Sequence, residues 1–326
     1  MIRVLARGDV ESALPMSAAI EAVKAAFVQL SKSRAEMPMR SSLEVSAHSG
    51  VTLVMPGYLR GDDAMAVKIV SVFNDNPSKG LPRIHALVVV VDAETGRPGA
   101  VMDGTYLTAL RTGAASGAAT EALARENARV TAIVGAGTQG RTQLEAVCDV
   151  RPIERAWVVD IDRDAAEAMC AEMAERLDLP VEPAASAAEA LSGADVVCTA
   201  TTSSSPVFDD VDLRPGTHIN AVGAYTPAMQ EIPAETVQRG LLVVDHRASA
   251  LAEAGDLLIP MEQGLFDEAH IHAELGEIIA GDKAGRTSEE QITLFKSVGV
   301  AAQDVAAASA VLAAAKSRDL GIQARV

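Results

Sequence analysis

The sequence predicts an α/β protein with two domains: a doubly wound parallel sheet in the second half of the chain and a separate α+β domain in the first. The chain has 326 residues, and a single hydrophobic core rarely grows beyond roughly 250–300 residues. From residue 129 onward, short apolar runs alternate with helical stretches. Such βαβ alternation is typical of parallel strands joined by right-handed crossovers and covered by helices on both faces.

The first half of the chain combines helices with a predicted sheet. Apolar residues at spacings of three and four predict an amphipathic helix over 17–33. Runs of β-branched residues bounded by Gly, Asn and Pro predict strands over 51–56, 64–73 and 84–92. Helical spacing returns over 105–126, and we expect this helix to connect the two domains.

Five short apolar strands follow the connecting helix. They span 129–134, 156–160, 195–200, 218–223 and 241–245. A long alanine-rich helix is predicted over 294–316 and is expected to return to the first domain. The predicted domains are therefore residues 1–115 together with 300–326, and residues 116–299.

Composition and charge exclude several classes of protein. Hydrophobic residues make up 49% of the chain and charged residues 22%, which excludes a wholly disordered chain. The formal net charge of −16 opposes binding to nucleic acid or anionic membranes, and no basic patch offsets it. The charged, proline-containing start is unlike a signal peptide, and the three cysteines form no disulfide or metal pattern. We therefore expect a cytoplasmic protein.

A glycine-rich loop follows the first strand of the second half. Gly135, Gly137 and Gly140 form a G-x-G-x-x-G motif between a strand and a helix. In this context the first glycine permits a tight turn, the second lets the backbone approach a pyrophosphate, and the third lets helix and strand pack closely. Asp160 ends the next strand, where a carboxylate binds the adenosine ribose hydroxyls and repels a 2′-phosphate. The pattern predicts a Rossmann domain that binds NAD(H), with NADP(H) retained as an alternative because Arg163 lies nearby.

Three basic residues of the first half lie in apolar surroundings. Lys68 lies within a β-branched strand, Arg111 within a helix and Arg40 in a loop. A strand lysine either points to solvent or loses its hydration at a substantial cost, which a bound carboxylate offsets. Each arginine also has an ordinary alternative as a surface residue. His270 and His272 have no identifiable third ligand, so no metal site is predicted.

Several separate motifs carry a resemblance to a known family. They are AVKIVSVFNDNPSKGLP around Lys68, DGTYLTALRTGAASGAAT around Arg111, the loop GAGTQG, and the segments GTHINAVGAYTP, AELGEIIAG and SVGVAAQD. With these motifs the chain resembles the ornithine cyclodeaminase and mu-crystallin family over essentially its whole length. The resemblance implies an NAD-binding domain over 116–299, a substrate-binding and dimerisation domain formed by the rest of the chain, and a homodimer.

The resemblance also implies roles for individual residues. Arg40, Lys68 and Arg111 match the positions that hold an amino-acid or imino-acid carboxylate, a task suited to guanidinium and ammonium groups. Val298 matches a position that borders the substrate. The cofactor positions match the glycine loop and, in addition, Thr138, Gln139, Asp160, Val222, Gly223 and Ser297.

One segment departs from the cyclodeaminase pattern. Cyclodeaminases of this family carry an aspartate in a G-G-D-x-P segment and a lysine two positions beyond its proline, whereas this chain has Tyr225 and Met229. The departure favours reduction of a cyclic ketimine carboxylate, such as 1-pyrroline-2-carboxylate or 1-piperideine-2-carboxylate, to a cyclic amino acid. Lys68, or a water that it holds, is the candidate acid for the imine nitrogen. Tyr225 is a second catalytic candidate, with simple packing as its alternative.

Three other functions stay open from the sequence. The chain could act as an ornithine cyclodeaminase that releases ammonia and proline, or as an alanine dehydrogenase-like oxidoreductase of a simple 2-amino acid. A mu-crystallin-like binding protein without catalysis is the non-enzymatic alternative. The joint presence of Lys68, Arg111, Asp160 and the glycine loop favours an enzyme.

Overall fold

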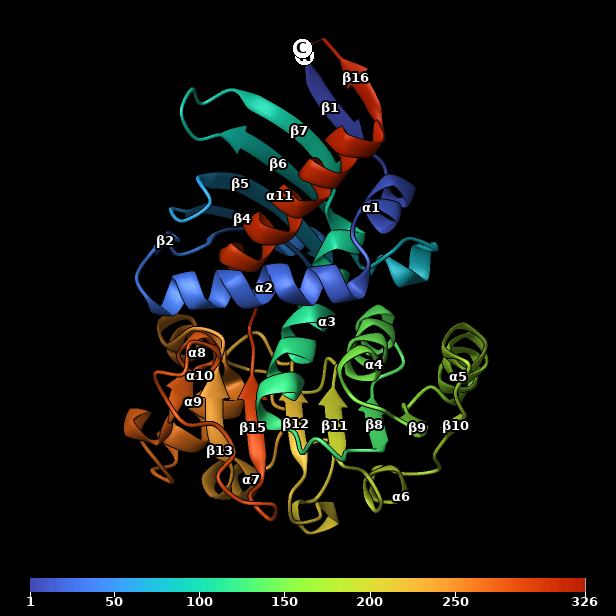
Figure 1. Ribbon diagram of the computed structural model, residues 1–326. Coiled ribbons are helices and arrows are strands. Elements are labelled where there is room, and N and C mark those ends of the chain that lie inside the picture. Colours follow the sequence, from blue (N-terminus) through green and yellow to red (C-terminus); the bar gives the residue numbers. More distant parts are fainter. Residues whose placement is uncertain (326) are drawn as a thin grey trace. The chain divides into compact units, whose positions relative to one another are not determined.

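The computed structural model describes residues 1–325, which divide between two units (Figure 1). Unit 1 consists of Met1–Arg111 together with the chain from Val300 on, and unit 2 consists of Thr112–Gly299. The divisions lie near the boundaries at 115 and 300 that the sequence predicts. Helix α3 (Gly104–Leu123) runs through the first division, so it contributes residues to both units.

Unit 1 is built on one eight-stranded, mainly antiparallel sheet. Among the strands that the structure describes in this unit, β1 and β7 form the single parallel pair. Its strands, in spatial order, are β16 (Ile322–Ala324), β1 (Ile2–Leu5), β7 (Pro98–Asp103), β6 (Ile84–Asp92), β5 (Ala64–Phe73), β4 (Gly50–Leu59) and β2 (Ala35–Glu36), with β3 (Ser41–Val45) also paired to β4.

Helices cover one face of this sheet. Helix α11 (Ala301–Arg318) packs against β4, β5 and β6, while α2 (Met16–Ser31) and α1 (Arg7–Ala13) pack against α11 (Figure 1). Because alternate residues of a strand point to opposite faces, the buried side chains of β5 include Lys68 beside Ala66 and Val70. The side chain of the predicted strand lysine therefore points into the unit and not to solvent.

The opposite face of the same sheet is apolar and exposed. Val54, Ile69 and Leu87 are neighbours in register across β4, β5 and β6. Their exposed fractions are 38%, 43% and 52%. A contiguous row of this kind is a candidate contact surface.

Unit 2 is built on a parallel sheet of eight strands. Its first five strands in chain order lie in the spatial order 3-2-1-4-5, which is that of a doubly wound dinucleotide fold. The full spatial order is β10 (Val181–Pro183), β9 (Arg155–Val159), β8 (Val130–Val134), β11 (Val196–Thr199), β12 (His218–Ala221), β15 (Thr293–Lys296), β13 (Leu241–Val244) and β14 (Ala273–Glu274).

Helices pack on both faces of the parallel sheet, as the βαβ pattern predicts. Ile133 of β8 packs with residues of α4 (Thr138–Val150) and α5 (Arg163–Leu177). Its neighbours on β8, Ala132 and Val134, pack into a second cluster. The helices of that second cluster are α6 (Ala187–Leu191), α7 (Ala234–Arg239), α8 (Arg247–Glu253) and α9 (Gly255–Glu262). The α/β fold class is thereby confirmed.

The remaining elements are short. Helix α10 spans Leu275–Ile279. Single 3₁₀ turns occupy Ser46–His48 and Pro77–Lys79 in unit 1, and Asp210–Asp212 and Glu268–His270 in unit 2. No single helix within residues 1–325 is long and apolar enough to cross a membrane, although α1 and α2 together meet that test as a bent pair by length and composition.

The predicted helix over 294–316 is wrong at its start. Thr293–Lys296 forms strand β15, and the helix begins only at Ala301. Gly299 lies between them with a φ of 80°, a left-handed conformation that interrupts a helix. A short apolar stretch such as Leu294–Phe295 fits a buried strand or a helix equally well by periodicity, so sequence pattern alone placed the boundary too early.

Candidate functional site

Unit 1 brings two of the predicted basic residues together on one carboxylate. Lys68 Nζ lies 2.7 Å from Asp304 Oδ2, and Arg111 Nε donates to Asp304 Oδ1 at 2.9 Å. Strand β5 carries Lys68, helix α3 carries Arg111, and the first turn of α11 carries Asp304. The side chains of Lys68 and Asp304 are only 1% and 2% exposed, so this charge cluster is buried.

The same helix start orients Arg111 through a second contact. Arg111 Nη1 donates to Gln303 Oε1 at 2.7 Å. That oxygen also accepts from the Val300 backbone N–H at 3.2 Å, which satisfies one of the free donors at the beginning of α11. The Arg111 guanidinium is thus fixed by two neighbouring side chains of α11.

Positive charge exceeds negative charge in this cluster. The pKa of Lys68 is lowered to about 8, first by burial and then by the positive charges of Arg111 and Arg40, against the opposing effect of Asp304. Arg40, which is half-buried, therefore lies close enough to act on Lys68, as the prediction of a shared site requires. Lys68 and Arg111 carry two positive charges against the one negative charge of Asp304, and a bound anion would neutralise the difference. This arrangement suits a substrate carboxylate.

The glycine loop of unit 2 has the geometry of a dinucleotide site. Gly135 directly follows β8 and has a φ of 111°, in the region that favours glycine. A β-carbon at Gly140 would clash with the Gly135 carbonyl oxygen, whereas the space beside Gly137 is open. Helix α4 begins at Thr138, so its N-terminal N–H groups face the open side of the loop.

Two polar groups beside this loop are suited to the cofactor. Asp160 Oδ2 accepts from the Ala136 backbone N–H at 2.7 Å, which places the carboxylate against the glycine loop. Oε1 of Gln139 is buried and has no hydrogen-bond partner among residues 1–325. An acidic residue after the second strand and an unpaired acceptor at the first turn of α4 fit the binding of NAD(H).

The other predicted cofactor residues lie at the carboxyl ends of neighbouring strands. Val222 and Gly223 follow β12, and Ser297 and Val298 follow β15, which pairs with β12. Asp245 holds the second of these loops, because its Oδ2 accepts from Ser297 Oγ at 2.7 Å and from the Val298 backbone N–H at 2.9 Å. In doubly wound folds ligands bind beyond these strand ends.

Tyr225 lies in the loop after β12. It is partly buried and packs against the core cluster of unit 2. This contact supports the packing interpretation for the ring.

Sequence reasoning missed four buried carboxylates: Asp304 in unit 1, and Glu231, Asp245 and Asp256 in unit 2. Asp304 ends the motif SVGVAAQD, so an acidic residue on the apolar face of an alanine-rich helix was the available signal. Asp245 directly follows an apolar strand, which is a recognisable position. Nothing in the spacing around Glu231 marks it as buried.

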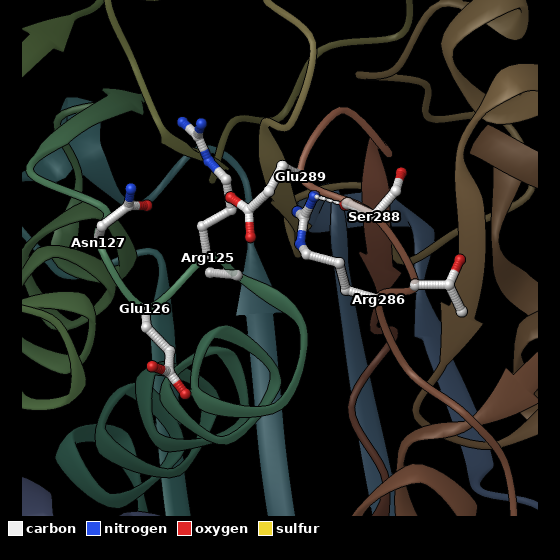
Figure 2. A pocket seen from close by; sticks show the side chains of 8 residues that line it. Arg125, Glu126, Asn127, Arg286, Ser288 and Glu289 are labelled. Atoms are coloured by element: carbon white, nitrogen blue, oxygen red, sulfur yellow. Dashed lines mark hydrogen bonds between the residues drawn. The ribbon is translucent and has the colours of Figure 1, made fainter.

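A cavity of about 650 Å³ opens elsewhere in unit 2 (Figure 2). It is lined by Ala124–Asn127 and Arg286–Glu289, which precede strands β8 and β15. It therefore lies at the amino ends of the strands, opposite the edge where nucleotides bind in this fold. Burial, more than the nearby charge of Arg125, lowers the pKa of Arg286 to about 10. We do not assign the cofactor to this cavity.

Within residues 1–325 no group of three or more His, Cys, Asp or Glu side chains is placed to hold a metal ion. The imidazoles of His270 and His272 instead contact the backbone carbonyls of Val237 and Ala284 at 2.7 Å and 2.8 Å.

Comparison with known proteins identifies the family. The model of the ornithine cyclodeaminase/mu-crystallin family matches residues 2–319. The chain belongs to this family. It is 39% identical over 319 residues to a delta(1)-pyrroline-2-carboxylate reductase of Bacillus cereus, a match that covers 98% of both chains.

Two solved structures of this family are closely similar. One is the delta(1)-pyrroline-2-carboxylate reductase of Thermococcus litoralis in complex with NADH and L-proline, with a TM-score of 0.97, 44% identity and coverage of 99% of this chain and 100% of that one. The other is an archaeal alanine dehydrogenase dimer with bound NAD, with a TM-score of 0.93, 38% identity and coverage of 99% of both chains. The predicted membership of the ornithine cyclodeaminase/mu-crystallin family is confirmed.

Proposed function

We propose that this member of the ornithine cyclodeaminase/mu-crystallin family reduces a cyclic ketimine carboxylate to a cyclic amino acid with NADH. The observation that carries the proposal is the surplus of positive charge formed by the buried side chains of Lys68 and Arg111 around Asp304. A small imino acid supplies the missing negative charge through its carboxylate. The similarity to pyrroline-2-carboxylate reductases, one of them bound to proline, supports the choice of a five-membered ring.

The basic residues divide the work of binding and proton donation. Arg111, held by Asp304 and Gln303, pairs with the substrate carboxylate. Lys68, whose pKa is near 8, is charged at neutral pH and can still release a proton, so it serves as the acid for the imine nitrogen. Bound NADH supplies the hydride that the carbon of the protonated C=N bond accepts. Arg40 and Arg111 keep the carboxylate neutralised after Lys68 has lost its proton.

On the cofactor side, Asp160 binds the adenosine ribose, and the loop of Gly135, Gly137 and Gly140 receives the pyrophosphate with Thr138 and Gln139. The fit of the loop geometry to a dinucleotide supports these roles. Val222, Gly223 and Ser297 complete the cofactor site, and Val298 borders the substrate. Because Asp160 is negative, NADH is preferred over NADPH.

A second candidate activity is the oxidation of a simple 2-amino acid. The archaeal alanine dehydrogenase, which covers 99% of this chain, favours it. Both reactions pass through an imino acid whose carboxylate needs the same cations. Ornithine cyclodeamination is the weaker alternative, because Tyr225 and Met229 replace the aspartate and lysine of that activity.

A substrate screen tests the proposal by following NADH absorbance for the imines and for pyruvate, and released ammonia for ornithine. The substrates are 1-pyrroline-2-carboxylate, 1-piperideine-2-carboxylate, pyruvate with ammonia, and ornithine with NAD. We expect the highest kcat/KM for a cyclic imine. Faster turnover of pyruvate with ammonia would assign an alanine dehydrogenase, and release of ammonia from ornithine would assign a cyclodeaminase. Binding of NADH without turnover of any substrate would favour a non-enzymatic protein.

We also propose a homodimer that covers the exposed face of the unit 1 sheet. The row of Val54, Ile69 and Leu87 supports this, and an isologous pairing would bury the row against its own copy. Helix α11 packs on the other face of its own sheet, so the sheet is the larger contributor to the contact. Sedimentation equilibrium at micromolar concentration tests the proposal, and a monomer there would contradict it.

A cytoplasmic location also stays a proposal. The three cysteines are free thiols, and burial raises the pKa of Cys148 and Cys198 to about 12 and that of Cys170 to about 11. Buried protonated thiols are typical of a reducing compartment. Fractionation of cells that produce the protein would test this.

A further inference from the structure

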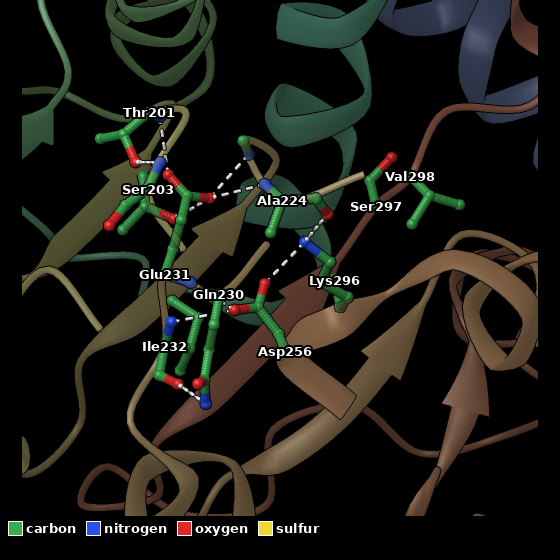
Figure 3. Close-up of polar contacts among 12 residues, drawn as sticks. Thr201, Ser203, Ala224, Gln230, Glu231, Ile232, Asp256, Lys296, Ser297 and Val298 are labelled. Carbon is green, nitrogen blue, oxygen red and sulfur yellow. Dashed lines mark hydrogen bonds and ion pairs between the residues drawn. The ribbon is translucent and has the colours of Figure 1, made fainter. Parts of the chain in front are cut away.

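A fully buried carboxylate joins the two loops that follow β11 and β12 (Figure 3). Glu231 Oε2 accepts from Thr199 Oγ1 at 3.0 Å and from the backbone N–H groups of Gly223 and Ala224 at 2.7 Å and 3.0 Å. Its Oε1 accepts from the Thr201 backbone N–H at 2.6 Å. Four donors therefore point at one side chain, which uses nearly all the acceptor capacity of a carboxylate.

A second buried pair holds the same loop from the other side. Lys296 Nζ donates to the Ala224 carbonyl oxygen at 2.6 Å and pairs with Asp256 Oδ2 at 2.7 Å. The other oxygen of Asp256 accepts from the backbone N–H groups of Glu231 and Ile232 at 2.6 Å and 3.0 Å. The peptide groups on both sides of Ala224 are thus bound to fully buried charged side chains.

The loop has no room to move toward its neighbour. A β-carbon at Gly223 would clash with Glu231 Oε1 and with the Thr201 backbone. Glycine is therefore required here by close approach, and its contacts keep the Gly223 backbone against the loop that follows β11.

The strand order of unit 2 indicates which half of a bound dinucleotide would lie beside the Val222–Ala224 loop. In a doubly wound fold the pyrophosphate binds at the end of the first strand, here β8, and the adenosine binds on the side of the second strand, here β9 with Asp160. Strands β11 and β12 lie on the other side of β8. The second nucleotide, which carries the nicotinamide, must therefore lie over the ends of β11 and β12, where Glu231 joins their loops.

We propose that Glu231, supported by Asp256 and Lys296, is a positioning residue that holds the Val222–Ala224 backbone in place for the nicotinamide half of the cofactor. Glu231 acts through the loops that it holds and not on the reacting atoms, because its side chain is fully buried and both of its oxygens accept from those loops. The inference rests on the proposed NADH-dependent function for its ligand, but it concerns the binding of that ligand and not the identity of the imine.

The test compares two ligands that share the adenosine half. NADH carries the nicotinamide, and ADP-ribose lacks it. In Glu231→Gln one carboxylate oxygen becomes an NH₂ group that faces backbone N–H donors, so the loop loses at least one of its bonds. We expect the Kd of NADH to rise about tenfold or more, with a changed emission spectrum of bound NADH, while the Kd of ADP-ribose stays within about twofold of its wild-type value.

Two further variants keep the test decisive. Glu235→Gln removes the same charge at an exposed position of the neighbouring helix α7 and should change neither Kd. Thr199→Val removes a single donor to Glu231 and leaves the carboxylate in place. If Glu231→Gln does not fold, Thr199→Val provides the test. We expect a smaller rise in the Kd of NADH for this variant and no rise in the Kd of ADP-ribose.

Several results would overturn the inference. They are an equal rise for both ligands, no rise for either ligand in a folded variant, or wild-type protein that binds NADH no more tightly than ADP-ribose. Failure of the proposed function looks different. In that case the two ligands would still separate in Glu231→Gln, but the wild-type enzyme would reduce no cyclic imine.

Discussion

Each unit contains a buried lysine paired with a buried aspartate at 2.7 Å, yet the two pairs have opposite surroundings. In unit 1 the third member is Arg111, so cations outnumber the carboxylate of Asp304. In unit 2 the third member is Glu231, so carboxylates outnumber the cation of Lys296. The excess negative charge in unit 2 is matched by the backbone N–H donors of Thr201, Gly223 and Ala224. The excess positive charge in unit 1 meets a neutral acceptor, Gln303 Oε1, which accepts from Arg111.

The groups around each buried lysine–aspartate pair therefore distinguish a charge cluster that binds a ligand from one that only stabilises the fold. Peptide N–H groups can stabilise a buried carboxylate without any ligand, because several converge on the same oxygens. Buried guanidinium and ammonium groups repel each other and need an added anion. The pKa of Lys68 is lowered by burial and then by the nearby positive charges, as expected for an ammonium group that lacks enough negative charge around it. A raised pKa of Glu231, caused by burial and then by Asp256, marks the opposite case.

The largest expected effect comes from removing the aspartate of either pair. Asp304→Asn and Asp256→Asn each leave a buried lysine without its partner, so each should lower the free energy of unfolding by about 3–5 kcal/mol. Urea unfolding measures this loss. Acetate should restore part of it only in Asp304→Asn, because an anion that enters the unit 1 cluster binds the folded state. Equal recovery of both variants would abolish the distinction between the two clusters.

Removal of Arg111 tests the binding role of the unit 1 cluster directly. Loss of a charge-assisted partner of a buried carboxylate costs about 2–5 kcal/mol, so Arg111→Ala should lower kcat/KM for the best imine by roughly one and a half to three and a half decades. The Kd of NADH should stay unchanged. Arg7→Ala, which removes an exposed arginine of the same unit, is the matched control. Near-wild-type kcat/KM with weakened NADH binding would reverse the assigned roles.

The pH dependence of activity should report the depressed pKa of Lys68. In the proposed mechanism the protonated lysine donates the proton to the imine nitrogen, and the pKa of this lysine lies at about 8 in place of 10.5. kcat/KM should therefore fall as pH rises through about 8, by about tenfold per pH unit. Steady-state kinetics at saturating NADH measure the profile. A profile that stays flat to about pH 10 would show that Lys68 keeps its ordinary pKa or plays no part.

Cofactor preference tests the adenosine side of unit 2. Asp160→Ser removes the negative charge that opposes a 2′-phosphate, so the ratio of kcat/KM for NADPH to that for NADH should rise about tenfold. Asp164→Ser, in the first turn of the neighbouring helix α5, is a suitable control. An unchanged ratio of the two kcat/KM values in Asp160→Ser would show that the Asp160 carboxylate does not determine the cofactor preference.

The smallest effect is expected at Tyr225. Its ring packs against the unit 2 core, and Tyr225→Phe keeps that packing while it removes the hydroxyl. We expect kcat to change by less than about threefold. A drop of about a hundredfold or more would instead assign the hydroxyl to proton transfer.

Local sequence pattern determined much of this protein. The glycine loop, Asp160 and the alternating strands are recognisable because their residues lie within about one βαβ unit of each other along the chain. The whole-length motifs indicated the family and the three basic residues. The boundary of helix α11 could not be placed in this way, because a short apolar run before a glycine fits either a strand or a helix.

The tertiary structure decided which groups those residues meet. Asp304 is 193 residues from Arg111 in the chain, and Glu231 lies 32 residues from Thr199, so no local spacing relates either pair. The sequence also did not determine which face of the sheet the Lys68 side chain occupies. In the structure it lies on the face that α11 covers. Burial makes the charge of each cluster matter, and burial is created by contacts between distant segments. The sequence therefore determined the chemical groups, whereas only the tertiary structure decided which cluster has charge left for a ligand.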